Sequence, residues 1–498
     1  MRREAELSIK KIKVMKDGFN LKSKYIPTKD QNNSIEGLLD GIGKYKQQTL
    51  KGITGSGKTF VLGNIINREN QPAIVLAPNK VLAYQLYNEL VEMFPENFVG
   101  YYVSNYDVYI PPYFNNNLNK KVNGTVVVNQ KNKDLRYAVK DFLDYSDKAI
   151  LICSSTILFP TFEKQLPELI TEHKSFIIRR LNEEMVKQVR DFKREGRFEE
   201  AERLGNHIDH TINMLLPSDS EYYNTDVIAI LGEKLGDFYL TDYFKKSKPN
   251  LFIDESHLTL LQLKALPSAN KVRLTKLVDK GFYISNVIKN NVLNFDALKD
   301  RVNTITYMSA TPSKFELDNS EYVSELVTRP NNIVDPKIII KEGEYFGGGE
   351  MINDVRDTIG KGETVFINCI SRKSVSNIHT LLSHNNIESE VIHFKIKQNE
   401  RKEILKDLRG GKINVIIGIN MLREGLDVKQ CSLVIVEQTS RNNFLRTKSC
   451  LIQVSGRAAR NINGEVFMCC NHISSSLAGA IEEIDYRRGK QLNLIGSI

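Results

Sequence analysis

The run Gly52-Ile53-Thr54-Gly55-Ser56-Gly57-Lys58-Thr59 is a complete G-x-x-x-x-G-K-[ST] phosphate-binding loop, and a helix-forming segment, Phe60 to Ile66, follows it. Glycines in such a loop let backbone N–H groups turn inward around the phosphates of a nucleotide. The lysine neutralises the outer phosphates, and the final hydroxyl can ligate Mg²⁺. The predicted nucleotide contacts are Thr54, Gly55, Ser56, Gly57, Lys58 and Thr59, with Thr59 also holding the metal.

Three later segments follow the loop at plausible distances along the chain. They are Asp254-Glu255-Ser256-His257, Ser309-Ala310-Thr311 and the arginine-rich run from Gln453 to Arg460. A phosphate-binding loop alone can occur by chance, whereas four ordered elements together are very unlikely to do so. The chain is therefore predicted to be a nucleotide-driven motor or switch.

The composition is that of a globular protein with two or three domains. With 498 residues the chain is too long for one core, and 41% hydrophobic with 26% charged residues argues against disorder. No apolar run approaches the roughly 20 residues that span a bilayer, and the N-terminus lacks the apolar segment of a secretory signal. We therefore expect a cytoplasmic protein. The net charge of +9 permits nucleic-acid binding without establishing it.

Cysteine and histidine spacings do not predict a metal site. The six cysteines lie mostly in apolar runs, so buried free thiols are expected. His207 and His210 share a helix face, but solvated side chains are favoured over a metal pair.

Short apolar runs alternate with helical patterns along most of the chain, which predicts parallel sheets covered by helices. The segment from Val327 to Pro336 contains two prolines and suits a linker. Because the phosphate-binding loop precedes this linker and the arginine-rich run follows it, we expect two α/β lobes with a cleft between them. The predicted strands are Ala73–Ala77, Ala149–Cys153, Leu251–Ile253, Ile305–Met308, Thr364–Ile367, Val415–Ile419, Ser432–Val436 and Gly464–Cys470.

A helical insertion interrupts the first half. Apolar residues recur at helical spacing from Leu181 to Phe192 and again from Ala201 to Leu215, with a turn at Arg194-Glu195-Gly196-Arg197 between them. This pattern predicts an antiparallel helical hairpin. Its charged residues are most simply a solvated face, with DNA contact as the alternative.

The acidic pair Asp254-Glu255 follows a predicted strand, which would deliver both carboxylates to the sheet edge that carries the phosphate-binding loop. Asp254 is predicted to hold Mg²⁺, and Glu255 to orient and deprotonate the water that attacks the γ-phosphate. A random acidic pair after a strand is the alternative, and the loop makes it improbable.

Arg457 and Arg460 lie three residues apart, which predicts one face of a helix. Guanidinium groups that cross the cleft could stabilise charge on the transferring phosphoryl group, and a solvated basic helix is the alternative. Upstream of the loop, Gln31 has donor and acceptor groups for the adenine edge, and Tyr25 could stack on the base. On its own this last pattern is weak.

The order of these elements resembles that of superfamily-2 helicases, and within them the UvrB family of bacterial nucleotide excision repair. The resemblance implies two RecA-like motor lobes, ATP and Mg²⁺ as cofactors, and DNA-dependent ATP hydrolysis. The segments that carry it are Gly52–Phe60, Leu76–Ala83, Gln85–Tyr87, Phe94–Asn97, Asp254–His257, Ser309–Pro312, Gly418–Asp427 and Gln453–Arg460.

The resemblance also implies sequence-independent contacts to DNA phosphates. The implied residues are Asn79, Lys80, Ser309, Thr311, Asn420 and Arg423, together with Tyr106 and Tyr109 of a β-hairpin at about residues 104–130. Asp427 is implied as a further nucleotide contact.

The chain departs from the family pattern in three places. Only two of the four tyrosines expected at the hairpin base, Tyr106 and Tyr109, remain. Between Cys153 and Asp254 there is room for the helical hairpin but not for the family's domain that docks UvrA. The chain also ends at Ile498, before the family's helical pair that engages UvrC. Binding to UvrA and UvrC, which the family implies, is therefore in doubt.

The expected organisation is an N-terminal extension over residues 1–24, a first lobe over 25–165 and 250–328, an insertion over 166–249, and a second lobe over 337–498. The favoured function is a UvrB-like DNA-dependent ATPase of excision-repair type. A nucleotide-gated DNA clamp, or a UvrB-derived mobile-element or defence protein, remains the alternative.

Overall fold

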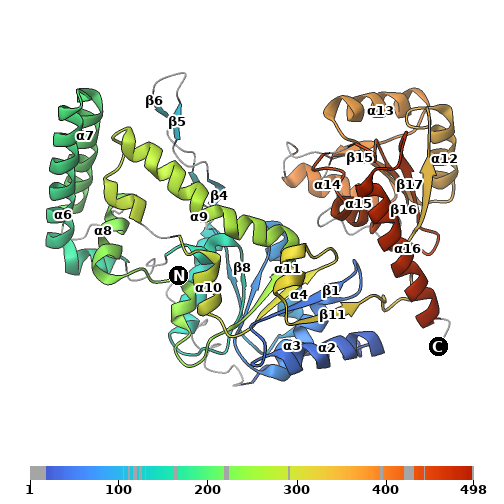
Figure 1. Cartoon of the computed structure of the whole chain (residues 1–498), viewed down its shortest axis with the longest axis horizontal. Coiled ribbons are helices and arrows are strands. Elements are labelled where there is room, and N and C mark those ends of the chain that lie inside the picture. Colours follow the sequence, from blue (N-terminus) through green and yellow to red (C-terminus); the bar gives the residue numbers. More distant parts are fainter. Residues whose placement is uncertain are drawn as a thin grey trace.

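A computed structural model describes residues 18–104, 106–109, 113–115, 120–122, 126–128, 130–160, 166–217, 224–289, 292–392, 396, 398–419, 431–441 and 443–495. These residues form two parallel-sheet lobes, a helical insertion and a projecting β-hairpin (Figure 1). None of the helices within the described ranges combines the length and the apolar character that crossing a membrane requires.

The first lobe is a seven-stranded sheet in the order β11-β1-β10-β9-β2-β8-β3, with every neighbouring pair parallel. Successive residues of a strand enter opposite cores: Ile74 and Leu76 pack into one, Ala73 and Val75 into the other. The strands are β1 (Gln47–Gly52), β2 (Ala73–Leu76), β3 (Val99–Tyr102), β8 (Ile150–Cys153), β9 (Asn250–Asp254), β10 (Ile305–Ser309) and β11 (Tyr322–Leu326).

Helices cover both faces of this sheet, as its doubly apolar strands require. One face carries α2 (Lys29–Gly41), α3 (Lys58–Glu69) and α4 (Lys80–Met93). The other carries α5 (Gln130–Leu143), the first half of α9 (Ser256–Asp279) and α10 (Phe295–Asp300). The short α11 (Lys314–Asn319) lies beside β1.

The second lobe is a six-stranded parallel sheet in the order β12-β17-β16-β13-β15-β14. Its strands are β12 (Lys337–Lys341), β13 (Thr364–Asn368), β14 (Glu390–Ile392), β15 (Val415–Gly418), β16 (Cys431–Val436) and β17 (Glu465–Cys469). Its helices are α12 (Gly349–Gly360), α13 (Arg372–His384), α14 (Gln398–Arg409), α15 (Lys448–Ser455) and α16 (Ser475–Ile495). All eight predicted strands and both α/β lobes are thereby confirmed.

The insertion contains the predicted helical hairpin, α6 (Leu166–Arg194) and α7 (Phe198–Leu215), with Gly196 in the left-handed conformation at the turn. A third helix, α8 (Thr225–Leu235), was not predicted. The apolar core of the insertion also takes Leu274 and Leu277 from α9, so this helix joins the insertion to the first lobe.

The prediction that His207 is solvated is wrong. Its Nε2 lies 2.8 Å from Oδ2 of the fully buried Asp226, whose other oxygen accepts the Ile284 N–H at 3.0 Å. The histidine therefore connects α7 to α8, and Asp226 connects α8 to the segment after α9. The six cysteines are free and buried, as predicted.

The predicted β-hairpin is present as two antiparallel ladders, β4 (Tyr106–Tyr109) with β7 (Val126–Val128), and β5 (Tyr113–Asn115) with β6 (Lys120–Val122). It projects from the first lobe beside α9 (Figure 1).

The segment before α2 packs on the first lobe. Phe19 is buried against Phe94, and the Lys22 N–H donates to the Met93 carbonyl. Residues 18–22 therefore pack on the first lobe, inside the range predicted to be an extension.

Candidate functional site

The phosphate-binding loop connects β1 to α3. Gly55 and Gly57 adopt φ of 81° and 83°, and a Cβ on Gly57 would stand 2.7 Å from the Gln31 amide nitrogen. Both positions therefore favour glycine. Lys58 starts α3, and its Nζ donates to the Gly52 and Ile53 carbonyls at 3.1 and 3.4 Å. The result is a helix N-terminus preceded by a tight loop, which is a ready anion site.

A cavity of about 300 Å³ lies between this loop and the second lobe. It brings together most of the predicted catalytic, phosphate and metal residues from segments more than 400 residues apart. Ser56 is the exception, because it is fully buried and its hydroxyl donates to the Ile53 carbonyl. The lining residues are Thr54, Gly55, Gly57, Lys58, Thr59, Leu82, Gln85, Leu86, Glu89, Asp254, Glu255, Ala310, Gln453, Arg457 and Arg460.

The two carboxylates stand where β9 ends. Asp254 is the last residue of the strand, and burial together with the Glu255 carboxylate raises the pKa of Asp254 to about 7. Glu255 has φ of 41°, a left-handed conformation that is unusual for a residue with a side chain. The strained turn starts α9 immediately and leaves both acidic side chains in the cavity.

A polar chain connects the acidic pair to the second lobe through His257. Its Nδ1 lies 2.8 Å from the Ser309 hydroxyl and 3.6 Å from Glu255 Oε2, and its Nε2 lies 2.6 Å from the Gln453 amide nitrogen. An amide nitrogen donates, so Nε2 accepts and the proton resides on Nδ1. The Ser309 hydroxyl also accepts the Thr311 N–H at 2.9 Å.

The resemblance implies that Ser309 and Thr311 contact DNA phosphates, and this stays a prediction. Ser309 is fully buried and Thr311 nearly so. In this conformation the Ser309 hydroxyl serves the contact between the two lobes.

Arg457 and Arg460 both line the cavity, but the prediction that they share a helix face is wrong. Helix α15 ends at Ser455, and Gly456 caps it, so both arginines follow in a turn. A Cβ on Gly456 would approach the Thr54 hydroxyl to 3.2 Å. Glycine at this position therefore lets the second lobe approach the phosphate-binding loop closely.

Arg329, in the linker between the lobes, was not predicted to take part. It is buried, and its Nε donates to the Thr54 carbonyl at 2.8 Å. Its other nitrogens donate to the Ile333 carbonyl at 2.9 Å and to the Asp335 carboxylate. Burial and the charge of Arg329 lower the pKa of Arg460. Only the folded chain reveals this contact, because 275 residues separate Arg329 from Thr54.

The C-terminal helix α16 fastens the lobes together at this point. The Gln491 amide donates to the Val327 carbonyl at 2.8 Å and accepts the Asp335 N–H at 2.6 Å. Arg487 donates to the Ala310 carbonyl at 2.7 Å, directly after Ser309. A shift of α16 would therefore change hydrogen bonds to the linker and to the Ser309-Ala310-Thr311 segment.

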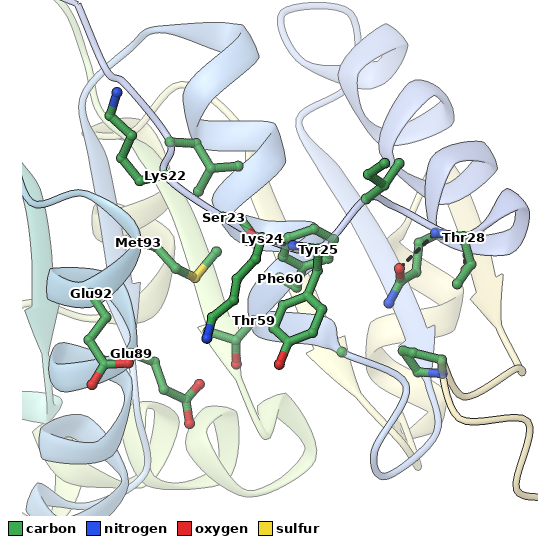
Figure 2. Close-up of a pocket in the computed structure, with 15 residues that line it drawn as sticks. Lys22, Ser23, Lys24, Tyr25, Thr28, Thr59, Phe60, Glu89, Glu92 and Met93 are labelled. Atoms are coloured by element: carbon green, nitrogen blue, oxygen red, sulfur yellow. Dashed lines mark hydrogen bonds between the residues drawn. The ribbon is translucent and has the colours of Figure 1, made fainter.

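A second cavity, of about 1330 Å³, opens beside the phosphate-binding loop. Figure 2 shows Tyr25 and Phe60 next to Thr59, with Glu89 and Glu92 of α4 across the opening. Tyr25 is 74% exposed, which leaves its ring free to stack. Gln31 is buried, its amide nitrogen donating to the Ser56 carbonyl at 2.8 Å and its oxygen accepting the Thr28 N–H at 3.0 Å.

Asn79, Lys80, Tyr106 and Tyr109 do not line either cavity. Asn79 caps α4, accepting the Val81 and Leu82 N–H groups, and Lys80 follows it. Tyr106 and Tyr109 belong to β4. Asn420, Arg423 and Asp427 lie outside the described residues.

The donor set fits a hard divalent cation. The Asp254 carboxylate and the Thr59 hydroxyl line one cavity, and Mg²⁺ prefers such oxygen donors. The raised pKa of Asp254 marks a carboxylate with insufficient positive charge beside it, even with Lys58 nearby. The residues present therefore suit Mg²⁺.

The raised pKa predicts how Asp254 affects stability when Mg²⁺ is absent. Between its ordinary value of 3.8 and about 7, the folded chain holds a proton that the unfolded chain releases, so stability falls as pH rises through this window. We expect Asp254→Asn to unfold at a higher temperature than the wild type at pH 8 and at the same temperature near pH 4. Thermal unfolding between pH 4 and pH 8 measures the difference in unfolding temperature between the variant and the wild type. Asp318→Asn, at an exposed position on α11, is the control. A constant difference at every pH would contradict the assignment.

Comparisons with known proteins agree with this geometry. The helicase conserved C-terminal domain matches residues 350–462, and the type III restriction enzyme, res subunit, matches residues 24–179. The UvrABC system protein B of Caldanaerobacter subterraneus subsp. tengcongensis is 31% identical, over 95% of this chain and 86% of that protein. The corresponding protein of Kosmotoga olearia is 29% identical, with the same coverage.

Among solved structures, S. cerevisiae Dbp5 bound to RNA and ADP BeF3 covers 93% of this chain and 88% of its own, at 14% identity and a TM-score of 0.45. A likeness this low carries no argument about the present chain. The sequence relationship to the UvrABC system protein B of Caldanaerobacter does show the family, since it covers almost the whole of this chain at 31% identity. The chain belongs to the UvrABC system protein B family, and it is an ATP-hydrolysing enzyme of the helicase type.

Proposed function

We propose that this chain hydrolyses ATP in the cleft between its lobes and couples hydrolysis to sequence-independent binding of DNA, as an excision-repair type of motor. The observation that carries the proposal is the convergence of Lys58, Asp254, Glu255 and Arg457 on one cavity between the lobes. These residues supply a phosphate clamp, a metal carboxylate, a base and a cation from the opposite lobe, which are the parts that phosphoryl transfer to water requires.

Each residue has a distinct role in this proposal. Lys58 leaves the loop carbonyls and binds the β- and γ-phosphates, while Thr59 and Asp254 hold Mg²⁺. Mg²⁺ held by these two residues would supply positive charge that neutralises the phosphate oxygens. Glu255 orients the attacking water and takes its proton, and Arg457 and Arg460 stabilise charge that develops on the phosphoryl group. Tyr25 and Gln31 border the place for the adenine base.

Coupling to DNA would run through the contacts between the lobes. The His257 imidazole contacts Glu255 and Ser309 in the first lobe and Gln453 in the second lobe. The position of this imidazole beside Glu255 therefore depends on whether the second lobe is in contact with the first. Closure would also deliver Arg457 to the phosphates. Hydrolysis would then depend on lobe position, and a DNA strand that stabilises the closed state would accelerate it.

The test is ATP turnover with and without a single-stranded oligonucleotide. We expect DNA to raise kcat severalfold. Turnover that is absent both with and without DNA would overturn the proposal, and slow turnover that DNA does not change would favour the nucleotide-gated clamp. RNA of the same length serves as the control for DNA specificity.

Arg329→Lys should weaken nucleotide binding. Lysine keeps the charge but cannot donate to Thr54, Ile333 and Asp335 together, so the loop loses its fixed turn. We expect the Kd for ATP to rise about tenfold, the factor for a loss of ~1.4 kcal/mol. Arg301→Lys is the matched control, since Arg301 pairs with Asp242 and precedes the N-terminal end of β10, whereas the phosphate-binding loop follows the C-terminal end of the parallel strand β1. Equal effects of both substitutions would contradict this role.

We expect no stable complex with UvrA. Among the described residues between Cys153 and Asp254, the main elements are α6, α7 and α8, which share one core with α9 and leave no separate docking domain. The alignment to the Caldanaerobacter relative extends over 579 positions, more than the chain contains, so it has gaps opposite segments that this chain lacks. Interfaces below about 1,000 Å² rarely hold a stable complex. Size-exclusion chromatography with UvrA tests this, with a full-length UvrB as the positive control, and co-elution would show that other surfaces dock.

A further inference from the structure

The last helix, α16, carries charged side chains that reach the first lobe, although its apolar residues pack in the core of the second lobe. Glu483 of α16 lies 3.2 Å from Lys51 of β1. One turn or two further along, Lys490 lies 2.9 Å from Glu325 of β11. Lys51 and Glu325 also pair with each other, at 3.2 Å. Four charges of alternating sign therefore cross from one lobe to the other, and they are called the α16 ion network below.

The contact on the first lobe lies at the start of the phosphate-binding loop. Lys51 is the residue before Gly52, with which the loop begins. In the parallel sheet it stands opposite Glu325 of β11 on one side and opposite Ser309 of β10 on the other. The ion pair with Glu483 therefore attaches α16 to the strand that carries the loop.

The contact on the second lobe leads toward Arg457. Glu483 lies 2.9 Å from Arg487 in the next turn of α16 and 3.7 Å from Lys448. Lys448 is the first residue of α15, and Arg457 follows the end of that short helix. A single carboxylate thus faces three cations, one from β1, one from α15 and one from α16. Displacement of Glu483 from Lys51 would move the segment before Arg457 away from the phosphate-binding loop.

The network is ionised at neutral pH and only partly shielded from water. The hydrogen bond from Lys490 lowers the pKa of Glu325. Burial acts to raise the pKa of Glu483, but the charges of Arg487 and Lys51 lower it overall. The side chains of Lys51 and Glu483 are 23% and 18% exposed. Dissolved salt screens ion pairs that water can reach, so the attraction should weaken as ionic strength rises.

Other contacts between the lobes respond less to salt, because they pair uncharged groups. The Gln453 amide donates to His257, and the Gln491 amide donates to the Val327 carbonyl in the linker. The α16 ion network is therefore the contact through which ionic strength can change the position of the second lobe.

We propose that Lys51 and Glu483 are positioning residues for hydrolysis, because their ion pair holds the second lobe against the phosphate-binding loop and so keeps Arg457 in the cleft. This inference rests on the proposed function and adds the charges that maintain the contact between the lobes. Neither residue lines the cavity between the lobes, so both act through Arg457 and not on the nucleotide.

The first test is ATP turnover without DNA by Lys51→Met, which removes the charge and keeps an unbranched side chain. At ~50 mM salt we expect kcat to fall about fivefold, the factor for ~1 kcal/mol, which is the upper range for one partly exposed pair. The KM for ATP should change little. Raising salt to ~0.5 M should lower the wild-type kcat toward that of the variant and leave the variant nearly unchanged.

The matched control is Lys341→Met. Lys341 of β12 is 19% exposed and likewise lies between two carboxylates, those of Glu350 and Asp354, but both belong to its own lobe. It should keep the wild-type kcat and the wild-type response to salt. Equal effects of Lys51→Met and Lys341→Met would overturn the proposal, because loss of any strand lysine would then account for them.

A double-mutant cycle tests whether the two residues act through their shared contact. Glu483→Gln should also lower kcat, and Lys51→Met/Glu483→Gln should be no slower than the slower single variant. Effects that multiply in the double variant would overturn the pair. Thermal unfolding of each variant checks that the lobes remain folded.

A readout that does not need hydrolysis measures the position of the lobes directly. Small-angle X-ray scattering without nucleotide should give a larger radius of gyration for Lys51→Met than for the wild type at ~50 mM salt, and the wild type should expand toward the variant at ~0.5 M. An unchanged radius together with an unchanged kcat would overturn the network alone. A wild type that hydrolyses no ATP, with or without DNA, would overturn the proposed function, and scattering would still test the network.

Discussion

Lys58→Ala is expected to abolish ATP turnover while leaving the fold intact. The lysine places one positive charge against the outer phosphates, and loss of one such preorganised group commonly lowers kcat by about 10²- to 10³-fold. Its present bonds to the Gly52 and Ile53 carbonyls are partly exposed, so their loss should change the free energy of unfolding by about 1 kcal/mol or less. Phosphate release and thermal unfolding measure the two effects.

The control for this substitution is Lys187→Ala, which removes an exposed lysine from α6 in the insertion. It should leave turnover unchanged. Wild-type turnover by Lys58→Ala would contradict the assignment of the cleft as the hydrolytic site. A large drop in the unfolding temperature would instead show that the lysine supports the loop.

Strands whose apolar residues are continuous could be read from the sequence, because a strand buried on both faces needs no polar residue. β2, β8 and β16 have this character. β1 does not, since it begins with Gln47 and Gln48, and it escaped prediction. Its polar side chains are buried only because distant groups satisfy them: the Tyr307 hydroxyl donates to Gln47 at 2.6 Å, and Gln48 bonds the Leu38 carbonyl and the Thr306 hydroxyl, each at 3.1 Å.

The same limit applies to the candidate site. Residues in short contiguous patterns, such as Lys58 and Asp254, were placed in the cavity from the sequence, because the geometry that brings them there is local to a strand end. Glu316 was missed. It is fully buried and accepts hydrogen bonds from the Ser256 hydroxyl and the Ser313 N–H, so it joins the start of α9 to α11. Its role depends on a contact across 60 residues, which no local pattern encodes.

Arg457 illustrates a prediction that was right about place and wrong about local structure. Spacing alone suggested a helix face, but Gly456 ends α15 and turns the chain toward Thr54. The turn places Arg457 at the contact between the lobes. If α15 continued as a helix, it would direct Arg457 away from this contact. In the proposed function Arg457 reaches the phosphates only when the lobes close, and the last prediction tests this role.

Arg457→Ala is expected to lower kcat far more than it weakens ATP binding. A cation that acts on charge developing in the transition state contributes little to the ground state, and rate effects of about 10³ to 10⁵ are known for arginine fingers. Arg457 is 8% exposed, so truncation also leaves a space at the contact between the lobes. Arg457→Lys separates the two effects, since it fills this space and keeps a charge while losing the planar fork.

The measurement compares kcat with the Kd for ATP, obtained from a fluorescent nucleotide, in both variants. Arg356→Ala, which removes an exposed arginine from α12 that donates to the Asn385 carbonyl, is the control and should alter neither value. Partial recovery of kcat in Arg457→Lys, with ATP affinity near that of the wild type, would support the finger. Equal losses of turnover and affinity would make Arg457 a ground-state ligand. Hydrolysis would then not depend on this arginine crossing the cleft, and coupling between the lobes would have to rely on His257 and α16.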